Sequence, residues 1–537
     1  MIAYSMLEID TRISVPFLWG KTVFRKRHWS KVNLIVGPNG SGKTILAEKI
    51  AARFSAKGYG VRILHGGQIN EDEESFISVL RENTRVQAKI ESVLSDMFAK
   101  SIRFETSAGG IPVPVVVNTA SGVEYNLREG ECHGLKEILL LLSVLYGGNP
   151  RSEKKTCFVF DEPELHLHPQ LQMFFMNEIR LVAERSPDTV FFLITHSPFF
   201  IDLRFPADLL GVVVCHSNRA PTSLEKLSAA DSSLFQRFLP RFNTYHKQFF
   251  FSDSQIFVEG YTDQQIFSIL LSTFEGKNGT AGTGVIDVGG KDELGVFFKV
   301  CALLGTDARV ITDLDSLFRG KLCDVLCDDP RPAAWLAAGM DENRELYTRL
   351  FPDLRKNGQV TLRRLIGRLE AFLSDIGAAA LAAGDACFAS RPERQNGGRP
   401  QTVSPQEIFL SKLQFFAQSK DREQLEDLDT FKTVILQAVF TKGALDGIIK
   451  EETAAAVPVV KKLCRLIFAA AESARVYVLP KGCIEHYYIQ NKTEYMPVPG
   501  KDRLFHEERA FMLSVKPANL RRSYAALTDI LFRALSR

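Results

Sequence analysis

Four carboxylates follow two apolar segments in the second half of the chain. Glu259 and Asp263 belong to the sequence IFVEGYTD, and Asp313 and Asp315 belong to VITDLDS about fifty residues later. Negative charges gathered at the ends of two strands repel one another and are tolerated when cations lie between them, and oxygen ligands favour Mg²⁺ or Mn²⁺. Such ions activate water and stabilise a leaving 3′ oxygen, so the pattern predicts phosphodiester cleavage.

A second set of residues predicts a nucleotide site. The sequence GPNGSGKT (37–44) follows the apolar segment NLIV and precedes a predicted helix, which is the context that a phosphate-binding loop requires. Backbone amides of this loop would cradle the β-phosphate, Lys43 would reach the β- and γ-phosphates, and the Thr44 hydroxyl would bind Mg²⁺. The predicted ATP-binding residues of the loop are Asn39, Gly40, Ser41, Gly42, Lys43 and Thr44.

Two further apolar segments supply partners for this loop. Asp161 and Glu162 follow FVF, where Asp161 can hold Mg²⁺ and Glu162 can polarise the attacking water. His196 follows VFFLIT and is predicted to sense the γ-phosphate. Acids at strand ends and single histidines also occur for purely structural reasons, but the combination with a phosphate-binding loop favours an ATPase.

The elements that position these residues predict an α/β fold. Lys31–Val36, Cys157–Phe160 and Val190–Ile194 are almost wholly apolar, as central strands covered on both faces are. We predict an N-terminal P-loop ATPase domain of the ABC type and a second α/β domain that is interrupted by a helical insertion. The predicted boundaries are 1–245 for the ATPase, 253–317 and 472–537 for the two parts of the second domain, and 318–471 for the insertion.

Composition narrows the class of protein. With 537 residues, 45% hydrophobic and 24% charged, the chain is neither disordered nor membrane-embedded. Its longest apolar segment, Ile138–Tyr146, is too short for a bilayer span of about 20 residues, and the first residues do not have the pattern of a signal peptide. Nine scattered cysteines fit reduced thiols, so we expect a cytoplasmic protein without a membrane partner. A net charge of +3 leaves nucleic-acid binding to local basic patches.

The nucleotide motifs resemble the ABC-type ATPases of the SMC/RecF/OLD group. In that group His168-Pro169 resembles the D-loop and His196 the switch histidine, and two heads enclose ATP, which implies a homodimer or a tetramer built from it. Gln68 is the candidate Q-loop residue. The segment LREGECHGLKEILLLL (127–142) stands where the signature loop is expected and departs from its usual Ser-Gly-Gly. Only 118 residues separate Lys43 from Asp161, too few for the coiled-coil arm of an SMC protein.

The acidic motifs resemble a Toprim domain, and their order behind an ABC-type ATPase resembles the OLD (overcoming lysogenization defect) endonucleases, including Gabija-type and retron-linked members. The resemblance implies that Glu259, Asp263, Asp313 and Asp315 bind metal and that Glu485 in GCIE (482–485) is a further ligand. Family members often carry Asp where this chain has Cys483. The resemblance also implies that Lys291 contacts the DNA backbone and that a late lysine stabilises the transition state; Lys516 is the first candidate and Lys481 the second.

These readings together predict an ATP-regulated, Mg²⁺- or Mn²⁺-dependent nuclease that cleaves or nicks DNA. The resemblance implies prokaryotic anti-phage defence, with a helicase or retron RNA/DNA as a partner. An RNA (tRNA) nuclease of an abortive defence system and a non-cleaving ATP-dependent scaffold with a degenerate Toprim site remain alternatives. A topoisomerase or primase is a further alternative, but no module with a nucleophilic tyrosine is identifiable. The sign of the ATP effect stays open.

Overall fold

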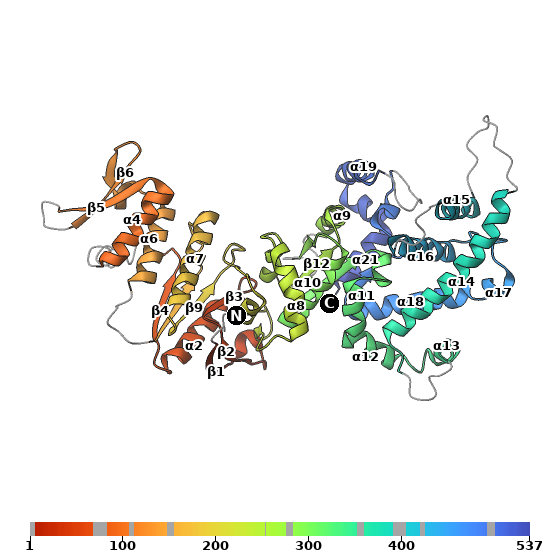
Figure 1. Ribbon diagram of the computed structural model, residues 1–537, viewed down its shortest axis with the longest axis horizontal. Coiled ribbons are helices and arrows are strands. Elements are labelled where there is room, and N and C mark those ends of the chain that lie inside the picture. The colour runs from red at the N-terminus through yellow and green to blue at the C-terminus, as the bar shows by residue number, and fades with distance from the viewer. Residues whose placement is uncertain are drawn as a thin grey trace. The chain divides into compact units, whose positions relative to one another are not determined.

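The chain forms two compact units in the computed structural model (Figure 1). The first comprises Met1–Asp253 with Leu303–Thr306, and the second comprises Ser254–Ala302 with Asp307–Arg537. The structure describes residues 6–67, 83–106, 112–147, 155–252, 254–274, 283–351, 359–389, 404–418, 425–490 and 500–536.

A six-stranded sheet forms the centre of the first unit. Its order is β11-β10-β3-β9-β8-β4, and all neighbours run parallel except the edge strand β11. The strands are β3 (Val32–Val36), β4 (Gly60–His65), β8 (Thr156–Asp161), β9 (Thr189–Ile194), β10 (Val212–Val214) and β11 (Thr222–Ser223). The three strands predicted from their apolar sequences, β3, β9 and β8, are adjacent at the centre of this sheet, which confirms the prediction of buried strands.

Smaller sheets and helices complete the first unit. β1 (Leu7–Ile13) pairs with β2 (Phe24–Trp29), and β5 (Lys100–Thr106), β6 (Pro112–Asn118) and β7 (Glu124–Asn126) form an antiparallel sheet. The helices are α1 (Pro16–Trp19), α2 (Lys43–Ser55), α4 (Thr84–Phe98), α5 (Leu127–Gly130), α6 (His133–Tyr146), α7 (Pro169–Arg185) and α8 (Ala229–Phe238), with 3₁₀ turns η1 (Pro206–Gly211), η2 (Leu239–Arg241) and η3 (His246–Phe251). The aromatic rings of Trp29, Phe54 and Phe192 pack edge to face and fix α2 against the sheet.

A four-stranded parallel sheet forms the centre of the second unit. Its order is β13-β12-β14-β15, built from β12 (Ser254–Val258), β13 (Gly284–Asp287), β14 (Asp307–Thr312) and β15 (Val476–Val478). Helices α9 (Tyr261–Ser272), α10 (Lys291–Leu304), α19 (Lys501–Ser514), α20 (Pro517–Ser523) and α21 (Ala525–Leu535) belong to this part, with 3₁₀ turns η4 (Leu314–Leu317) and η6 (Ile484–Tyr487). Ile256, Leu270 and Leu531 lie in one buried apolar cluster that joins sheet and helices.

Helices fill the chain between β14 and β15, as the sequence predicts. They are α11 (Lys321–Asp328), α12 (Pro330–Ala338), α13 (Arg344–Leu350), α14 (Leu362–Ala389), α15 (Pro405–Gln418), α16 (Leu425–Phe440), α17 (Glu451–Ala454) and α18 (Val457–Ser473). α14 packs against α15, α16 and α18 (Figure 1). β15 then pairs with β14, so the helices are inserted into a continuous sheet. Among the described residues, the helices are too short or too polar to cross a membrane.

Candidate active sites

The phosphate-binding loop connects β3 to α2 and depends on glycine. Gly37, Gly40 and Gly42 have φ angles of 142°, 76° and 84°, a region that other residues rarely adopt. The Lys43 ammonium donates to the carbonyl oxygens of Gly37 (3.2 Å) and Pro38 (2.9 Å), so the side chain lies along its own loop. Asn39 and Ser41 lie in the same loop. The loop therefore has the backbone shape that exposes amides to a phosphate.

Asp161, at the end of β8, meets the first turn of α2. The Thr44 hydroxyl donates to Asp161 Oδ2 at 2.9 Å, and His65 Nδ1 lies 3.1 Å from the same oxygen. Asp161 Oδ1 is buried and has no hydrogen-bond partner within the described part of the chain. A hydroxyl beside a carboxylate with an unsatisfied oxygen fits a Mg²⁺ site. The sequence predicts Thr44 and Asp161 as Mg²⁺ ligands, and the structure brings their side chains together, whereas sequence reasoning missed His65.

Glu162 and His196 face each other at the ends of β8 and β9. Glu162 has a φ of 53°, an uncommon backbone conformation for a residue other than glycine and one that recurs at functional sites. Its Oε1 lies 3.6 Å from His196 Nε2. Burial and the Lys43 charge lower the pKa of His196, which favours its neutral form. Glu164, which sequence reasoning missed, accepts the His196 backbone N–H at 2.6 Å.

The expected Q-loop residue, Gln68, lies outside the described residues. Its neighbour Gly67 donates its N–H to Glu137 Oε1 at 3.5 Å. Glu137 is fully buried on α6, and burial raises its pKa to about 7. At the start of the same helix, Gly134 approaches the segment before His168-Pro169, the predicted D-loop, so closely that a Cβ there would lie 2.6 Å from the His166 carbonyl oxygen. Helix α6, which begins within the predicted signature segment, thus contacts Gly67 and the loop that contains His166.

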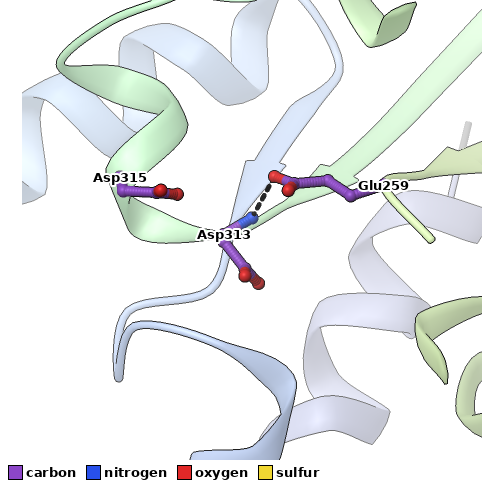
Figure 2. A group of neighbouring side chains, drawn as sticks. All are labelled: Glu259, Asp313 and Asp315. Carbon is purple, nitrogen blue, oxygen red and sulfur yellow. Dashed lines mark hydrogen bonds between the residues drawn. The ribbon is translucent and has the colours of Figure 1, made fainter. Parts of the chain in front are cut away.

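In the second unit, Glu259 follows β12 and is held by the end of β14. One oxygen, Oε1, accepts hydrogen bonds from the Thr312 hydroxyl (2.6 Å), the Asp313 backbone N–H (3.0 Å) and the Ser316 hydroxyl (2.7 Å). Figure 2 shows the bond from the Asp313 backbone, which links the two acidic motifs directly. Three donors on one oxygen fix the orientation of the carboxylate. Thr312 and Ser316 are positioning residues that sequence reasoning missed.

Glu259, Asp313 and Asp315 form a carboxylate cluster (Figure 2). One oxygen of each lies within 4.8 Å of the others. Asp315 Oδ1 is buried and has no hydrogen-bond partner among the described residues, and its Oδ2 lies 3.2 Å from the Lys291 ammonium. Lys291 begins α10 after Gly289-Gly290, and the Gly290 N–H donates to the Glu259 carbonyl at 2.7 Å. The GGK motif therefore places a cation beside the cluster.

Asp263 and Glu485 add their charges to this cluster. Asp263 lies in the first turn of α9 and Glu485 in η6 after β15. Burial, followed by the charges of Glu259 and Glu485, raises the pKa of Asp263 to about 8. Burial and the charges of Glu259 and Asp263 also hold the pKa of Asp313 well above its usual value. The charges of Asp263 and Glu485 therefore act on the carboxylate cluster, and metal binding by these five residues stays a prediction.

A second lysine beside these carboxylates, after Lys291, is Lys501, which sequence reasoning missed. Its ammonium lies 3.2 Å from Glu485 Oε1, in the first turn of α19. Burial acts to raise the pKa of Glu485, but Lys501 and hydrogen bonds outweigh it and the net shift is downward. Of the two lysines favoured from sequence, Lys516 is exposed at the start of α20, and Lys481 lies over the Tyr487 ring at 4.7 Å.

Cys483 occupies the position where relatives often have Asp. Its side chain is buried, and its Sγ lies 3.4 Å from His486 Nδ1. Burial, followed by the nearby charges of Asp313 and Glu485, raises the pKa of the thiol. A neutral thiol is a poor ligand for hard cations, so the carboxylates carry the metal-binding capacity of this site.

Comparisons with known proteins match both units. Residues 250–315 match the family "Overcoming lysogenization defect protein-like, TOPRIM domain", and residues 133–202 match "AAA domain, putative AbiEii toxin, Type IV TA system". A protein of Thermus scotoductus named "OLD nuclease" is 30% identical over 168 residues. That match covers 30% of this chain and 31% of the relative, so it spans about a third of the relative's length.

A solved structure also matches at low similarity. A chain in the crystal structure of Stu0660 of Streptococcus thermophilus is 10% identical, and the match covers 44% of this chain and 86% of that one. The TM-score is 0.27, which is too low to support a conclusion about the fold. The family matches, in contrast, include Asp161, Glu162 and His196 in one range and Glu259, Asp263, Asp313 and Asp315 in the other, but not the loop 37–44 or Glu485.

Proposed function

The chain joins an AAA-type ATPase domain to a Toprim domain of the OLD family, and we propose that it is an ATP-regulated, divalent-metal-dependent nuclease that cleaves or nicks DNA. One observation carries the proposal: Glu259, Asp313 and Asp315 form a carboxylate cluster at the carboxyl ends of parallel strands, and the charges of Asp263 and Glu485 act on it. Active sites of open α/β sheets lie at this edge.

The five carboxylates suit Mg²⁺ or Mn²⁺. Asp315 Oδ1 is buried without a hydrogen-bond partner among the described residues, and burial together with the charges of Glu259 and Glu485 raises the pKa of Asp263, so bound cations would stabilise the ionised carboxylates. Bound cations would supply a nucleophilic water at neutral pH and stabilise the leaving oxygen. Glu259 is held in place for this role by Thr312 and Ser316.

Lys501 is the residue best placed to act on the scissile phosphate from the protein side. It lies at the Glu485 edge of the carboxylate group, and its side chain is about half exposed, so its ammonium can meet a substrate phosphate. We therefore assign to Lys501 the stabilising role that the family resemblance first suggested for Lys516 or Lys481. Lys291, on the Asp315 side, would contact the DNA backbone.

In the ATPase domain, Lys43 would bind the β- and γ-phosphates, while Thr44 and Asp161 would hold Mg²⁺. Glu162 would polarise the attacking water, and the neutral His196 would accept a hydrogen bond or contact the γ-phosphate. Gln68 completes the proposed nucleotide residues. Head-to-head dimers, or tetramers built from them, would enclose ATP, and nucleotide occupancy would then regulate the nuclease.

The biological setting that we propose is prokaryotic anti-phage defence in the cytoplasm, with a helicase or retron RNA/DNA as a partner. The test is cleavage of supercoiled DNA and of tRNA with Mg²⁺ or Mn²⁺, with and without ATP. DNA cleavage supports the proposal. If only tRNA is cleaved, the assignment of the nuclease site is supported but the substrate is RNA. If neither nucleic acid is cut under any of these conditions, the proposal of a free-standing nuclease fails and the scaffold alternative gains support.

A further inference from the structure

A pocket of 420 Å³ opens between the helical insertion and the loop that carries Glu485. Helices α15 and α16 form its walls on the insertion side, and residues 480–486 close it on the Toprim side. Its volume falls in the range of about 300–1,000 Å³ that is typical of small-molecule sites. The residues that determine its chemistry are Phe409, Lys412, Gln437, Phe440, Lys481 and His486.

The lining combines flat apolar surface with positive charge. Phe409 is buried in the wall, and Phe440 is 40% exposed. Lys412 is only 8% exposed, and Lys481 adds a second ammonium. Among the described residues that line the pocket, none is a carboxylate. The lining thus joins aromatic rings to two lysines, a combination that favours a ligand with a flat ring and an anionic group.

Hydrogen bonds connect the pocket to the carboxylate group. Lys412 Nζ donates to Gln437 Oε1 at 3.2 Å, and the Gln437 amide donates to the Lys481 carbonyl and lies 3.4 Å from His486 Nδ1. His486 is adjacent in sequence to Glu485. A Cβ at Gly482 would lie 2.9 Å from the side chains of both Gln437 and His486, and the φ of 119° also favours glycine here. An occupant of the pocket thus contacts the turn that holds a proposed metal ligand.

We propose that this pocket binds one nucleotide unit: its base stacks on the aromatic wall and its phosphate meets the lysines. Aromatic walls accept any base because every base presents a flat face, and clustered lysines neutralise phosphates. The adjacent Glu485 favours a nucleotide of the substrate strand, next to the phosphate that is cut. The inference rests on the proposed nuclease function and extends it to a base-binding subsite supplied by the insertion.

The test uses the full chain with Thr441→Trp, which fills the pocket mouth, and Lys412→Met, which removes the buried charge but keeps the stem. Lys442→Met, an exposed neighbour outside the lining, is the matched control. Fluorescence anisotropy measures the Kd of a labelled DNA oligonucleotide in a Glu259→Gln background, which prevents cleavage. Each pocket variant should raise the Kd by about tenfold, the scale of one lost stacking interaction, while the control leaves it unchanged.

Two further experiments distinguish a nucleotide of the substrate strand from a free nucleotide. An oligonucleotide with abasic sites should bind the Glu259→Gln protein as weakly as an intact one binds the pocket variants. Calorimetry with dAMP tests whether the ligand is a free nucleotide. If dAMP binding requires Lys412 while the pocket variants bind the oligonucleotide normally, the pocket binds a nucleotide, but a free one and not a unit of the substrate strand. The inference is overturned if both pocket variants retain their melting temperature and bind oligonucleotide and dAMP like the control.

Failure of the inference is distinct from failure of the proposed function. A chain with native Glu259 that cuts DNA, together with pocket variants that bind and cut like it, overturns the pocket alone. A chain with native Glu259 that cuts neither DNA nor RNA overturns the nuclease proposal, whatever the pocket variants do in the binding assay.

Discussion

Lys501 and Glu485 form an ion pair, with the ammonium 3.2 Å from Glu485 Oε1, at the edge of the carboxylate group. The two residues are joined through tertiary structure, because Glu485 lies in η6 after β15 and Lys501 in the first turn of α19. This pair brings a positive charge to the Glu485 side of the five carboxylates, in addition to Lys291, which lies beside Asp315. It also distinguishes Lys501 from the exposed Lys516 by a direct contact.

We predict that Lys501→Met reduces DNA cleavage by about a hundredfold, the typical effect of removing one group that stabilises transition-state charge. Lys516→Met is the matched control and should cleave at the rate of the native chain. Steady-state nicking of supercoiled plasmid measures both variants, and their ATPase rates should be equal. Loss of cleavage in Lys516→Met, with Lys501→Met fully active, would reverse the assignment of the two lysines.

Lys43→Ala should abolish ATP hydrolysis, because the ammonium is the charge that contacts the β- and γ-phosphates. Phosphate release measures this effect, with Lys49→Ala, an exposed residue of α2, as the control. Comparing DNA cleavage by the Lys43→Ala and native chains with ATP gives the sign of nucleotide control. Hydrolysis by Lys43→Ala at the native rate would contradict the assignment of this loop as the ATP site.

Asp263→Asn should stabilise the metal-free protein at high pH. The pKa of Asp263 is about 8 in the folded chain and near 3.8 when the chain is unfolded. Between these values the folded state holds a proton that the unfolded state has lost, so this group lowers stability as pH rises from about 4 to 8. In EDTA, the melting temperature of Asp263→Asn should exceed that of the native chain by more at pH 8.5 than at pH 5.

The same variant should respond less to metal. Adding Mn²⁺ at pH 8.5 should raise the melting temperature of the native chain more than that of Asp263→Asn, because bound ligand stabilises the folded state in proportion to its affinity. Asp502→Asn, an exposed change on α19, is the control for both measurements. Equal Mn²⁺ shifts in Asp263→Asn and the native chain would exclude Asp263 as a metal ligand.

Glu137→Gln should remove a pH-dependent loss of folding stability in the first unit. Burial raises the pKa of Glu137 from 4.5 to about 7, so its contribution to stability falls as pH rises across that interval. The variant should therefore melt at a higher temperature than the native chain at pH 8, with a smaller difference at pH 5. Glu48→Gln, on the exposed face of α2, should show the same small difference at both values of pH.

The parts of the fold and site that sequence predicts are those encoded locally. The apolar segments of β3, β8 and β9 are each followed directly by candidate functional residues. The same short stretch of sequence therefore predicts both the strand and the residues at its end. Glu259 and Asp313 could be predicted for the same reason, because each directly follows a buried strand of the four-stranded sheet. Once the sheet forms, the parallel pairing of β12 and β14 brings both carboxylates to the carboxyl ends of neighbouring strands.

Contacts that depend on packing between distant segments could not be predicted in this way. Lys501 reaches Glu485 because α19 packs beside η6, and a lone lysine in a polar helix carries no local signal of that contact. His65 reaches Asp161 because β4 pairs with β8, a pairing that its short strand does not specify. Lys412 likewise carries no local signal in the sequence, because its place in the pocket depends on the packing of α15 against α16.

The most direct test is metal-dependent cleavage of supercoiled DNA by Glu259→Gln, measured beside the native chain. The control is Glu472→Gln, a change at the end of α18 where Glu472 pairs with Arg533. Glu259→Gln removes one charge from the carboxylate group but keeps an oxygen that accepts from Thr312 and Ser316. The account predicts cleavage by the native chain and Glu472→Gln, a loss of at least about a hundredfold in Glu259→Gln, and equal ATPase rates in all three. Cleavage by Glu259→Gln at the native rate would contradict it.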